Sequence, residues 1–148
     1  MPYLKITCSD AEHAQFQDMA QKLTAEIINL FYNPQSRVTR EELRQRTTIH
    51  FVPYQPDELY IGGQTVSQRG RKDVTVELSD WSMSVKKQKQ VAQVLTPVLA
   101  QLFSIPVTET DSINIRFHSY SPSDFAIGGK LLSDLVPTVG RIAKSIFG

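Results

Sequence analysis

Two stretches of the chain alternate apolar and polar residues, and apolar residues at helical spacing follow each stretch. The alternation in PYLKITCSD (2–10) and KDVTVELSD (72–80) predicts two strands. Both stretches end in Ser-Asp, residue types that favour helix N-caps. The patterns that follow predict helices over about 11–31 and 84–103. Pro97 falls inside the second helix and is expected to kink it.

The chain also repeats itself. The segment IHFVPYQPDELYIGG (49–63) aligns without gaps with IRFHSYSPSDFAIGG (115–129), and seven of the fifteen positions are identical. Each half is therefore predicted to run strand, helix, strand and a glycine-containing hairpin. This pattern predicts a single domain of two βαβ repeats, at about 2–63 and 72–129, joined by the polar, basic linker 64–72.

The expected fold class is α/β. A βαβ crossover makes its two strands parallel, so two units would give a four-stranded mixed sheet with two helices on one face. Several strand positions on both faces are apolar, which predicts that the uncovered face meets a partner and that the protein is an oligomer. The final segment, 137–148, is expected to be a short helical tail that packs at an interface or, alternatively, forms a lid.

Composition excludes several classes of protein. The net charge is +1, with 41% apolar and 21% charged residues, so nothing favours binding to nucleic acid or to a membrane surface. Cys8 is the single cysteine, which rules out an internal disulfide and predicts a buried apolar side chain. The start of the chain lacks the features of a signal peptide, so a cytoplasmic location is expected. Neither metal-ligand spacing nor a phosphate-binding glycine loop is present, which predicts chemistry without cofactor or metal.

The Met-Pro start, the doubled βαβ unit and the closing FAIGG of residues 125–129 together resemble the tautomerase superfamily. The resemblance is to its fused two-repeat members, of the 4-oxalocrotonate tautomerase and macrophage migration inhibitory factor type. It implies the β-α-β tautomerase fold, a homotrimer, and a keto–enol tautomerase (an isomerase) whose small substrate is usually carboxylated.

Two other functions remain open. One is hydration, dehalogenation or decarboxylation of an unsaturated or oxo acid. The members that catalyse these reactions place arginines just after the first strand of a repeat, whereas this chain has Glu12 and His13, or Trp81 and Ser82. The other is a binding or signalling trimer in which chemistry is incidental.

The resemblance makes Pro2 the catalytic residue. Removal of Met1 would expose its secondary amine, and burial of that amine disfavours the charged form and lowers its pKa. A neutral amine near physiological pH is a suitable general base. Only the first repeat has this amine, because the sequence alignment puts Lys72 at the equivalent place in the second repeat.

Six residues are candidates for contact with the substrate. Arg116 is expected to bind a carboxylate or to stabilise enolate charge, with Asn114 two residues earlier on the same strand face. Phe125 matches the apolar wall residue of the family, and Tyr3 adjoins Pro2. The other two are His50, which could equally be an ordinary strand histidine, and Lys72, which with Arg69 and Arg71 binds a carboxylate or forms a solvated linker.

Overall fold

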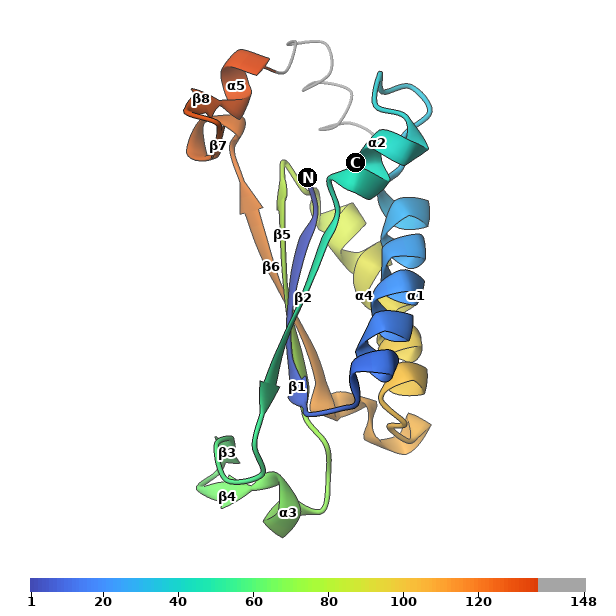
Figure 1. Ribbon diagram of the computed structural model, residues 1–148, viewed down its shortest axis with the longest axis vertical. Helices are drawn as coiled ribbons and strands as arrows, with labels where there is room; N and C mark the ends of the chain where they lie inside the picture. The colour runs from blue at the N-terminus through green and yellow to red at the C-terminus, as the bar shows by residue number, and fades with distance from the viewer. Residues whose placement is uncertain (136–148) are drawn as a thin grey trace.

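One four-stranded sheet, covered on one face by two long helices, forms the body of the computed structural model, which describes residues 1–135 (Figure 1). The long elements are β1 (Tyr3–Ser9), α1 (His13–Phe31), β2 (Thr48–Tyr54), β5 (Val74–Trp81), α4 (Val85–Leu102) and β6 (Ile113–Tyr120). The short ones are α2 (Arg40–Gln45), β3 (Tyr60–Ile61), β4 (Gln64–Thr65), α3 (Val66–Arg69), η1 (Val107–Ser112), η2 (Pro122–Asp124), β7 (Ala126–Ile127), β8 (Lys130–Leu131) and α5 (Leu132–Leu135). The predicted tail, 137–148, lies outside the described residues.

The strand order is β2-β1-β5-β6. Within each repeat the two strands are parallel, β1 with β2 and β5 with β6, as a βαβ crossover requires. The central pair, β1 and β5, is antiparallel and joins the two repeats. The predicted α/β class, a four-stranded mixed sheet with two helices on one face, is confirmed.

Strand register corrects the sequence alignment of the two repeats by two residues. Ser9 pairs with Tyr54 and Trp81 pairs with Tyr120, so Ser9 corresponds to Trp81 if the two tyrosines correspond. The helix starts agree, because His13 then corresponds to Val85. Counted back along the strands, the counterpart of Pro2 is Val74 and not Lys72. The sequence alignment matched the two Ser-Asp pairs, which are not structurally equivalent. Strand β5 continues through Asp80, whereas β1 ends before Asp10.

The predicted helix caps were also wrong. The N-caps are Glu12 and Ser84, and Ser84 accepts a hydrogen bond from the backbone N–H of Lys87. Asp80 is instead a strand residue of β5 with 1% of its surface exposed. Helix α4 runs on through Pro97, which lies on its exposed side and does not disturb the core.

The core lies between the sheet and helices α1 and α4. Alternate strand residues supply one side and helical residues supply the other, including Leu4, Ile6, Val76, Leu78, Leu23, Ile27, Leu95 and Leu99, each fully buried. Cys8 belongs to this core, as expected, and burial, with a smaller contribution from Asp10, raises the pKa of its thiol to about 11. None of the helices within residues 1–135 has the length and apolar character needed to cross a membrane.

The uncovered face of the sheet is largely polar, contrary to the expectation that both faces are apolar. Its central row runs across the four strands as His50, Lys5, Glu77 and Arg116. Strand alternation explains the difference, because the apolar residues of each strand occupy the helix side. An oligomer through this face would therefore depend on polar and charged contacts.

The Gly-Gly pairs form two-residue hairpin turns. Ile61 pairs with Gln64, so Gly62 and Gly63 are the two turn residues, with φ of 59° and 76°. Two positive φ angles in succession define the turn that matches strand twist, and glycine adopts them without steric cost. The second repeat forms the same turn at 128–129. The hairpins lie at opposite ends of the molecule, and the N-terminus lies at the end with β7 and β8 (Figure 1).

Leu95→Ala should test the core between α4 and the sheet. Leu95 is fully buried in the core, so truncation should lower the free energy of unfolding by about 2–5 kcal/mol. Urea unfolding followed by circular dichroism measures the change. Val107→Ala, at a residue that is 86% exposed, is the control and should change stability by less than about 0.5 kcal/mol. Equal losses in the two variants would contradict the assigned core.

Candidate active site

Pro2 is buried at the start of β1, where its carbonyl accepts a hydrogen bond of 3.0 Å from the Thr48 backbone N–H. That bond extends the β1–β2 pairing by one step and fixes the chain just before Tyr3. The terminal amine, which Met1 carries in this structure, donates to Asp80 Oδ1 at 2.6 Å. We call this end of the molecule, with the N-terminus, the last residues of β5 and β6 and the second hairpin, the amine end.

The alternation of β5 places Asp80 beside the amine. The buried positions of the strand are Val74, Val76, Leu78 and Asp80. The Asp80 carboxylate therefore lies on the same side of β5 as Leu78, which faces the core. The chain then turns at Ser82, whose φ is 52°, and the Ser82 N–H donates to the Tyr120 carbonyl at 2.9 Å. This bond holds the ends of β5 and β6 together and keeps Asp80 inside the sheet.

Two titratable side chains at this end respond to burial and to Asp80. Burial, with a smaller contribution from the Asp80 charge, raises the pKa of Tyr120 to about 12. Burial lowers the pKa of Lys87, Lys86 lowers it further, and Asp80 opposes both effects. The Lys87 ammonium donates to the Leu30 carbonyl at 2.5 Å and lies 5.5 Å from the ring centre of Phe31. Lys87 therefore ties α4 to the end of α1.

Phe125 and Tyr120 form a stacked aromatic pair at the amine end. Its ring stacks on Tyr120, with centroids 5.4 Å apart and an interplanar angle of 25°. The Leu132 N–H donates to the Phe125 carbonyl at 2.8 Å, which ties the second hairpin to α5. Phe125 thus lies against Tyr120 near the end of β6.

Tyr3 and His50 lie together on the uncovered face of the sheet. The Tyr3 hydroxyl and His50 Nδ1 are 2.8 Å apart, and the two rings meet edge to face. Tyr3 is 40% exposed, so this pair is open to solvent in the single chain. The two residues were singled out separately in the sequence, and the structure shows them as one hydrogen-bonded pair next to Pro2.

Arg116 and Asn114 do not meet Pro2 within one chain. Arg116 pairs with Glu77, which pairs with Lys5, so it lies two strands across from β1 and about 10 Å further along than Pro2. Asn114 lies further still. Both project from the uncovered face, whereas Pro2 shares the buried side of β1 with Leu4. Arg116 could therefore lie beside the amine of Pro2 only if it came from another copy of the chain.

Lys72 lies at the opposite end of the sheet from Pro2. Its ammonium donates to the Phe103 carbonyl at 3.0 Å, and Arg71 binds Asp111 and the Glu109 carbonyl. Arg69 Nη1 and Arg71 Nε are buried without a hydrogen-bond partner in the described part of the chain.

Asp73 is the acidic residue amid these cations. Burial raises the pKa of its carboxyl, and Thr75, Arg69 and Arg116 oppose that rise. Arg116 therefore belongs, within one chain, to the electrostatic surroundings of Asp73. Those surroundings lie at the far end of the sheet from the amine.

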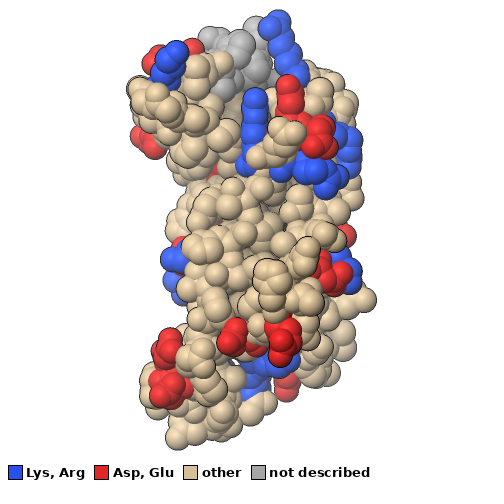
Figure 2. Space-filling view, in the orientation of Figure 1, with Lys and Arg blue, Asp and Glu red and all other residues tan. Residues whose placement is uncertain are grey.

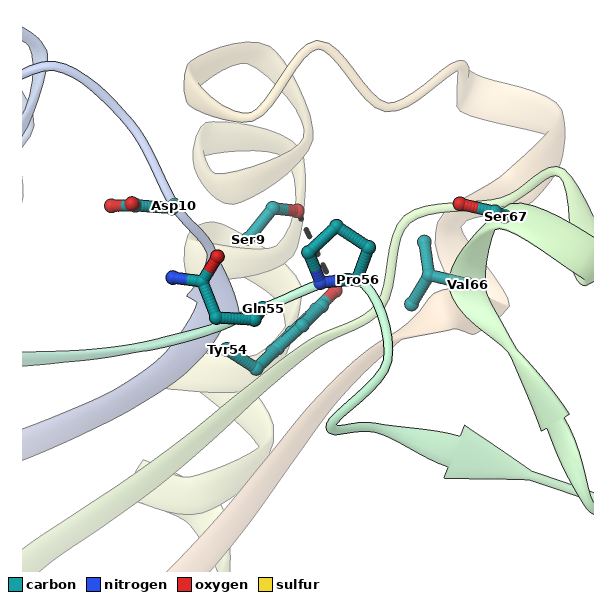
Figure 3. Close-up of a pocket in the computed structure, with 7 residues that line it drawn as sticks. All are labelled: Ser9, Asp10, Tyr54, Gln55, Pro56, Val66 and Ser67. Atoms are coloured by element: carbon teal, nitrogen blue, oxygen red, sulfur yellow. Dashed lines mark hydrogen bonds between the residues drawn. The ribbon is translucent and has the colours of Figure 1, made fainter.

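A cavity of about 300 Å³ is also found at this far end, between the end of β1 and α3 (Figure 3). Its lining residues are Ser9, Asp10, Tyr54, Gln55, Pro56, Val66 and Ser67. The corresponding places at the amine end include Trp81 in place of Ser9 and Leu132 in place of Val66. Trp81 and Leu132 have larger side chains than Ser9 and Val66.

Asp80, Tyr120 and Lys87 are the features of the amine end that sequence reasoning missed. Asp80 was taken for a helix cap, although it continues the alternation of buried residues in β5 at Val74, Val76 and Leu78. That alternation was the available signal. Tyr120 is one of the positions that are identical in the two repeats, opposite Tyr54, whereas nothing in the sequence pattern distinguishes Lys87 from an ordinary helix residue.

The face seen in Figure 2 carries charged side chains of both signs. Acidic and basic residues are intermixed toward both ends of the face seen in Figure 2, and uncharged residues occupy most of its middle. Among residues 1–135, no group of three or more His, Cys, Asp or Glu is placed to hold a metal ion.

No family model and no curated protein matches this chain. Several solved structures are similar to it. The F6 fused 4-OT asymmetric trimer has a TM-score of 0.74 at 14% identity, over 91% of this chain and 99% of that one. Pt0534 inactivated by 2-oxo-3-pentynoate has a TM-score of 0.71 at 9% identity, over 91% and 99%. The macrophage migration inhibitory factor-like protein of Entamoeba histolytica has a TM-score of 0.63 at 15% identity, over 88% and 97%.

The similarity to fused 4-OT and to the migration inhibitory factor-like protein covers nearly the whole chain. At these identities it shows the fold alone. The chain shares the fold of these structures, which agrees with the fold that the sequence resemblance implied.

Tyr54→Phe should test the polar anchor beneath the cavity. The Tyr54 hydroxyl donates to the Asp73 carbonyl at 2.8 Å and accepts from the Asp73 N–H at 3.3 Å, both buried. Its loss leaves two backbone groups without that partner, so the free energy of unfolding should fall by about 1–3 kcal/mol. Tyr60→Phe, at a residue that is 57% exposed, is the matched control for urea unfolding. No difference between the two variants would contradict the anchor.

Proposed function

We propose that this chain, which has the tautomerase fold, is a cofactor-free keto–enol tautomerase whose general base is the amine of Pro2. The observation that carries the proposal is the position of Pro2 itself. It is buried at the start of β1, in a fold shared with fused 4-OT over nearly the whole chain. The stacked rings of Phe125 and Tyr120 lie at the same end of the molecule and would limit the access of water.

The proposed chemistry needs one base and one group that stabilises negative charge. The neutral amine takes a proton from the carbon next to the substrate's carbonyl, and the electrons of that C–H bond become the enolate. The resulting ammonium returns a proton to the oxygen or to carbon, so the substrate is isomerised with no net gain or loss. Tyr3, hydrogen-bonded to His50, would donate to a substrate oxygen near Pro2.

A homotrimer is part of the proposal, because a single chain keeps Arg116 far from Pro2. Three of the similar fused 4-OT structures are trimers. Arg116, with Asn114, projects from the uncovered face, so a neighbouring chain would bring it toward the amine. Its guanidinium could then bind a substrate carboxylate through two parallel hydrogen bonds. We assign no role at the amine to Lys72, which lies at the other end of the sheet.

Pro2→Ala should reduce the enol–ketone conversion of phenylpyruvate by about a hundredfold or more, the effect expected for the loss of a general base. Ultraviolet absorbance follows the reaction, and mass spectrometry must first show that Met1 is absent from both proteins. Equal rates in processed wild type and variant would count against Pro2 as the base. An inactive wild type would favour a binding trimer instead.

The amine can also be probed without turnover. Pt0534 is inactivated by 2-oxo-3-pentynoate, an acceptor to which an amine adds by conjugate addition. Incubation of the processed chain with this compound, followed by peptide mass mapping, would place one added reagent on the N-terminal peptide if the amine is neutral and accessible. The chain that retains Met1 is the control, because its residue 2 nitrogen is an amide.

Arg116→Ala should raise KM for a carboxylated enol about tenfold or more and leave KM for an uncarboxylated enol nearly unchanged, because the lost contact is to the carboxylate. Arg116→Lys should lie between, since lysine binds a carboxylate without the bidentate geometry. Arg40→Ala on α2 is the control. Light scattering should give roughly 50 kDa, three chains of 16.7 kDa, for every variant. Equal KM changes for both substrates would contradict the assigned role.

A further inference from the structure

A buried carboxylate faces the terminal amine from the neighbouring central strand. Asp80 is 1% exposed, and its Oδ1 accepts from the Met1 ammonium at 2.6 Å. In the register of β1 and β5, Tyr3 pairs with Ser79, so the next step sets Pro2 opposite Asp80. The contact therefore comes from the register of the sheet and does not depend on the particular side chain of residue 1.

Removal of Met1 leaves the new amine close to the same carboxylate. The nitrogens of residues 1 and 2 are separated by three bonds, or about 3 Å. The amine of Pro2 would thus lie within about 6 Å of Asp80. An opposite charge at that range favours the charged form of a group, and the effect is larger in a buried place than in water.

Lys87 and Tyr120 are two ionisable side chains that respond to the charge of Asp80. Lys87 approaches from α4, but its ammonium donates to the Leu30 carbonyl and to Gln90, and Lys86 lies beside it. Tyr120 approaches from β6 as a neutral phenol, because burial raises its pKa to about 12. Burial of the amine favours its neutral form, so burial and Asp80 act on it in opposite directions.

From this geometry we infer that Asp80 is a positioning residue that holds the Pro2 amine of the processed chain as an ammonium ion at neutral pH. The inference rests on the proposed function in taking that amine as the working group. It adds that the base form is populated only in alkaline solution, so that the enol reaction accelerates as pH rises. Asp80 also fixes the direction of the amine, which it holds toward β5.

The test is a direct titration of the amine in the full chain with Met1 removed, labelled with ¹⁵N-proline. The chain has eight prolines, and every proline but the N-terminal one has a tertiary amide nitrogen that does not titrate. The free peptide PYLKI supplies the unburied, unpaired reference. The variant is Asp80→Asn, and the matched control is Glu77→Gln. Glu77 lies on the same strand, on the uncovered face, and its substitution removes the same charge.

The wild-type midpoint should be no lower than that of the peptide, although burial alone would put it below. Asp80→Asn should lower the midpoint by about one unit or more, and the alkaline limb of the pH–rate profile should move with it. Glu77→Gln should shift it by much less, because its charge is half exposed and distant. A wild-type midpoint below that of the peptide, or equal shifts in the two variants, overturns the inference.

Two further results separate a failure of this inference from a failure to fold and from a failure of the proposed function. If Asp80→Asn does not fold, Asp80→Glu, which keeps the carboxylate, should retain the wild-type midpoint, and a fall below the peptide would overturn the inference. The titration needs no substrate, so it remains decisive even if Pro2→Ala leaves the enol reaction unchanged and the proposed function fails. Conversely, loss of activity in Pro2→Ala with no effect of Asp80→Asn on the midpoint overturns this inference alone.

Discussion

The antiparallel pairing of β1 with β5 is the contact on which the rest of the molecule depends. Each βαβ unit supplies two strands of the main sheet and one long helix, and the core is built from both units. Pairing the two first strands makes one sheet and brings α1 and α4 side by side over a shared core. The same register sets Pro2 opposite Asp80. Stability and the candidate active site therefore follow from one set of backbone hydrogen bonds.

The antiparallel join also makes the two ends of the sheet equivalent by an approximate two-fold rotation, and the sequence then makes them different. One end has Pro2, Asp80 and large side chains such as Trp81. The other has Val74 in the place of Pro2, and cations grouped around Asp73. Val74 is an internal residue with an amide nitrogen, so the second end has no N-terminal amine. The two ends of the sheet therefore differ in the chemical groups that they offer.

Most of the fold could be predicted from the sequence, because the strands, helices and turns each follow from a local pattern of residues. Alternation identified the strands, helical spacing identified the helices, and Ile-Gly-Gly identified hairpins whose turns require positive φ. The site was less predictable, because its contacts depend on register. The end of β5 differs from that of β1 by two residues, which moved Asp80 from an expected cap into the core and replaced Lys72 by Val74 as the counterpart of Pro2. The residues that are identical in the two repeats did not reveal this two-residue shift.

A buried carboxylate has to be explained, since an unpaired charge in the core would cost several kcal/mol. Apolar residues occupy the other buried positions of β5, and a fourth one would fill the place of Asp80 without that cost. The cost is offset only where a cation meets the carboxylate, and the terminal ammonium does so at 2.6 Å. Asp80 and the terminal ammonium thus form an ion pair at the edge of the core. A proton transfer at that amine changes the charge of the core, so the folding of this end and its proposed chemistry are linked through one ion pair.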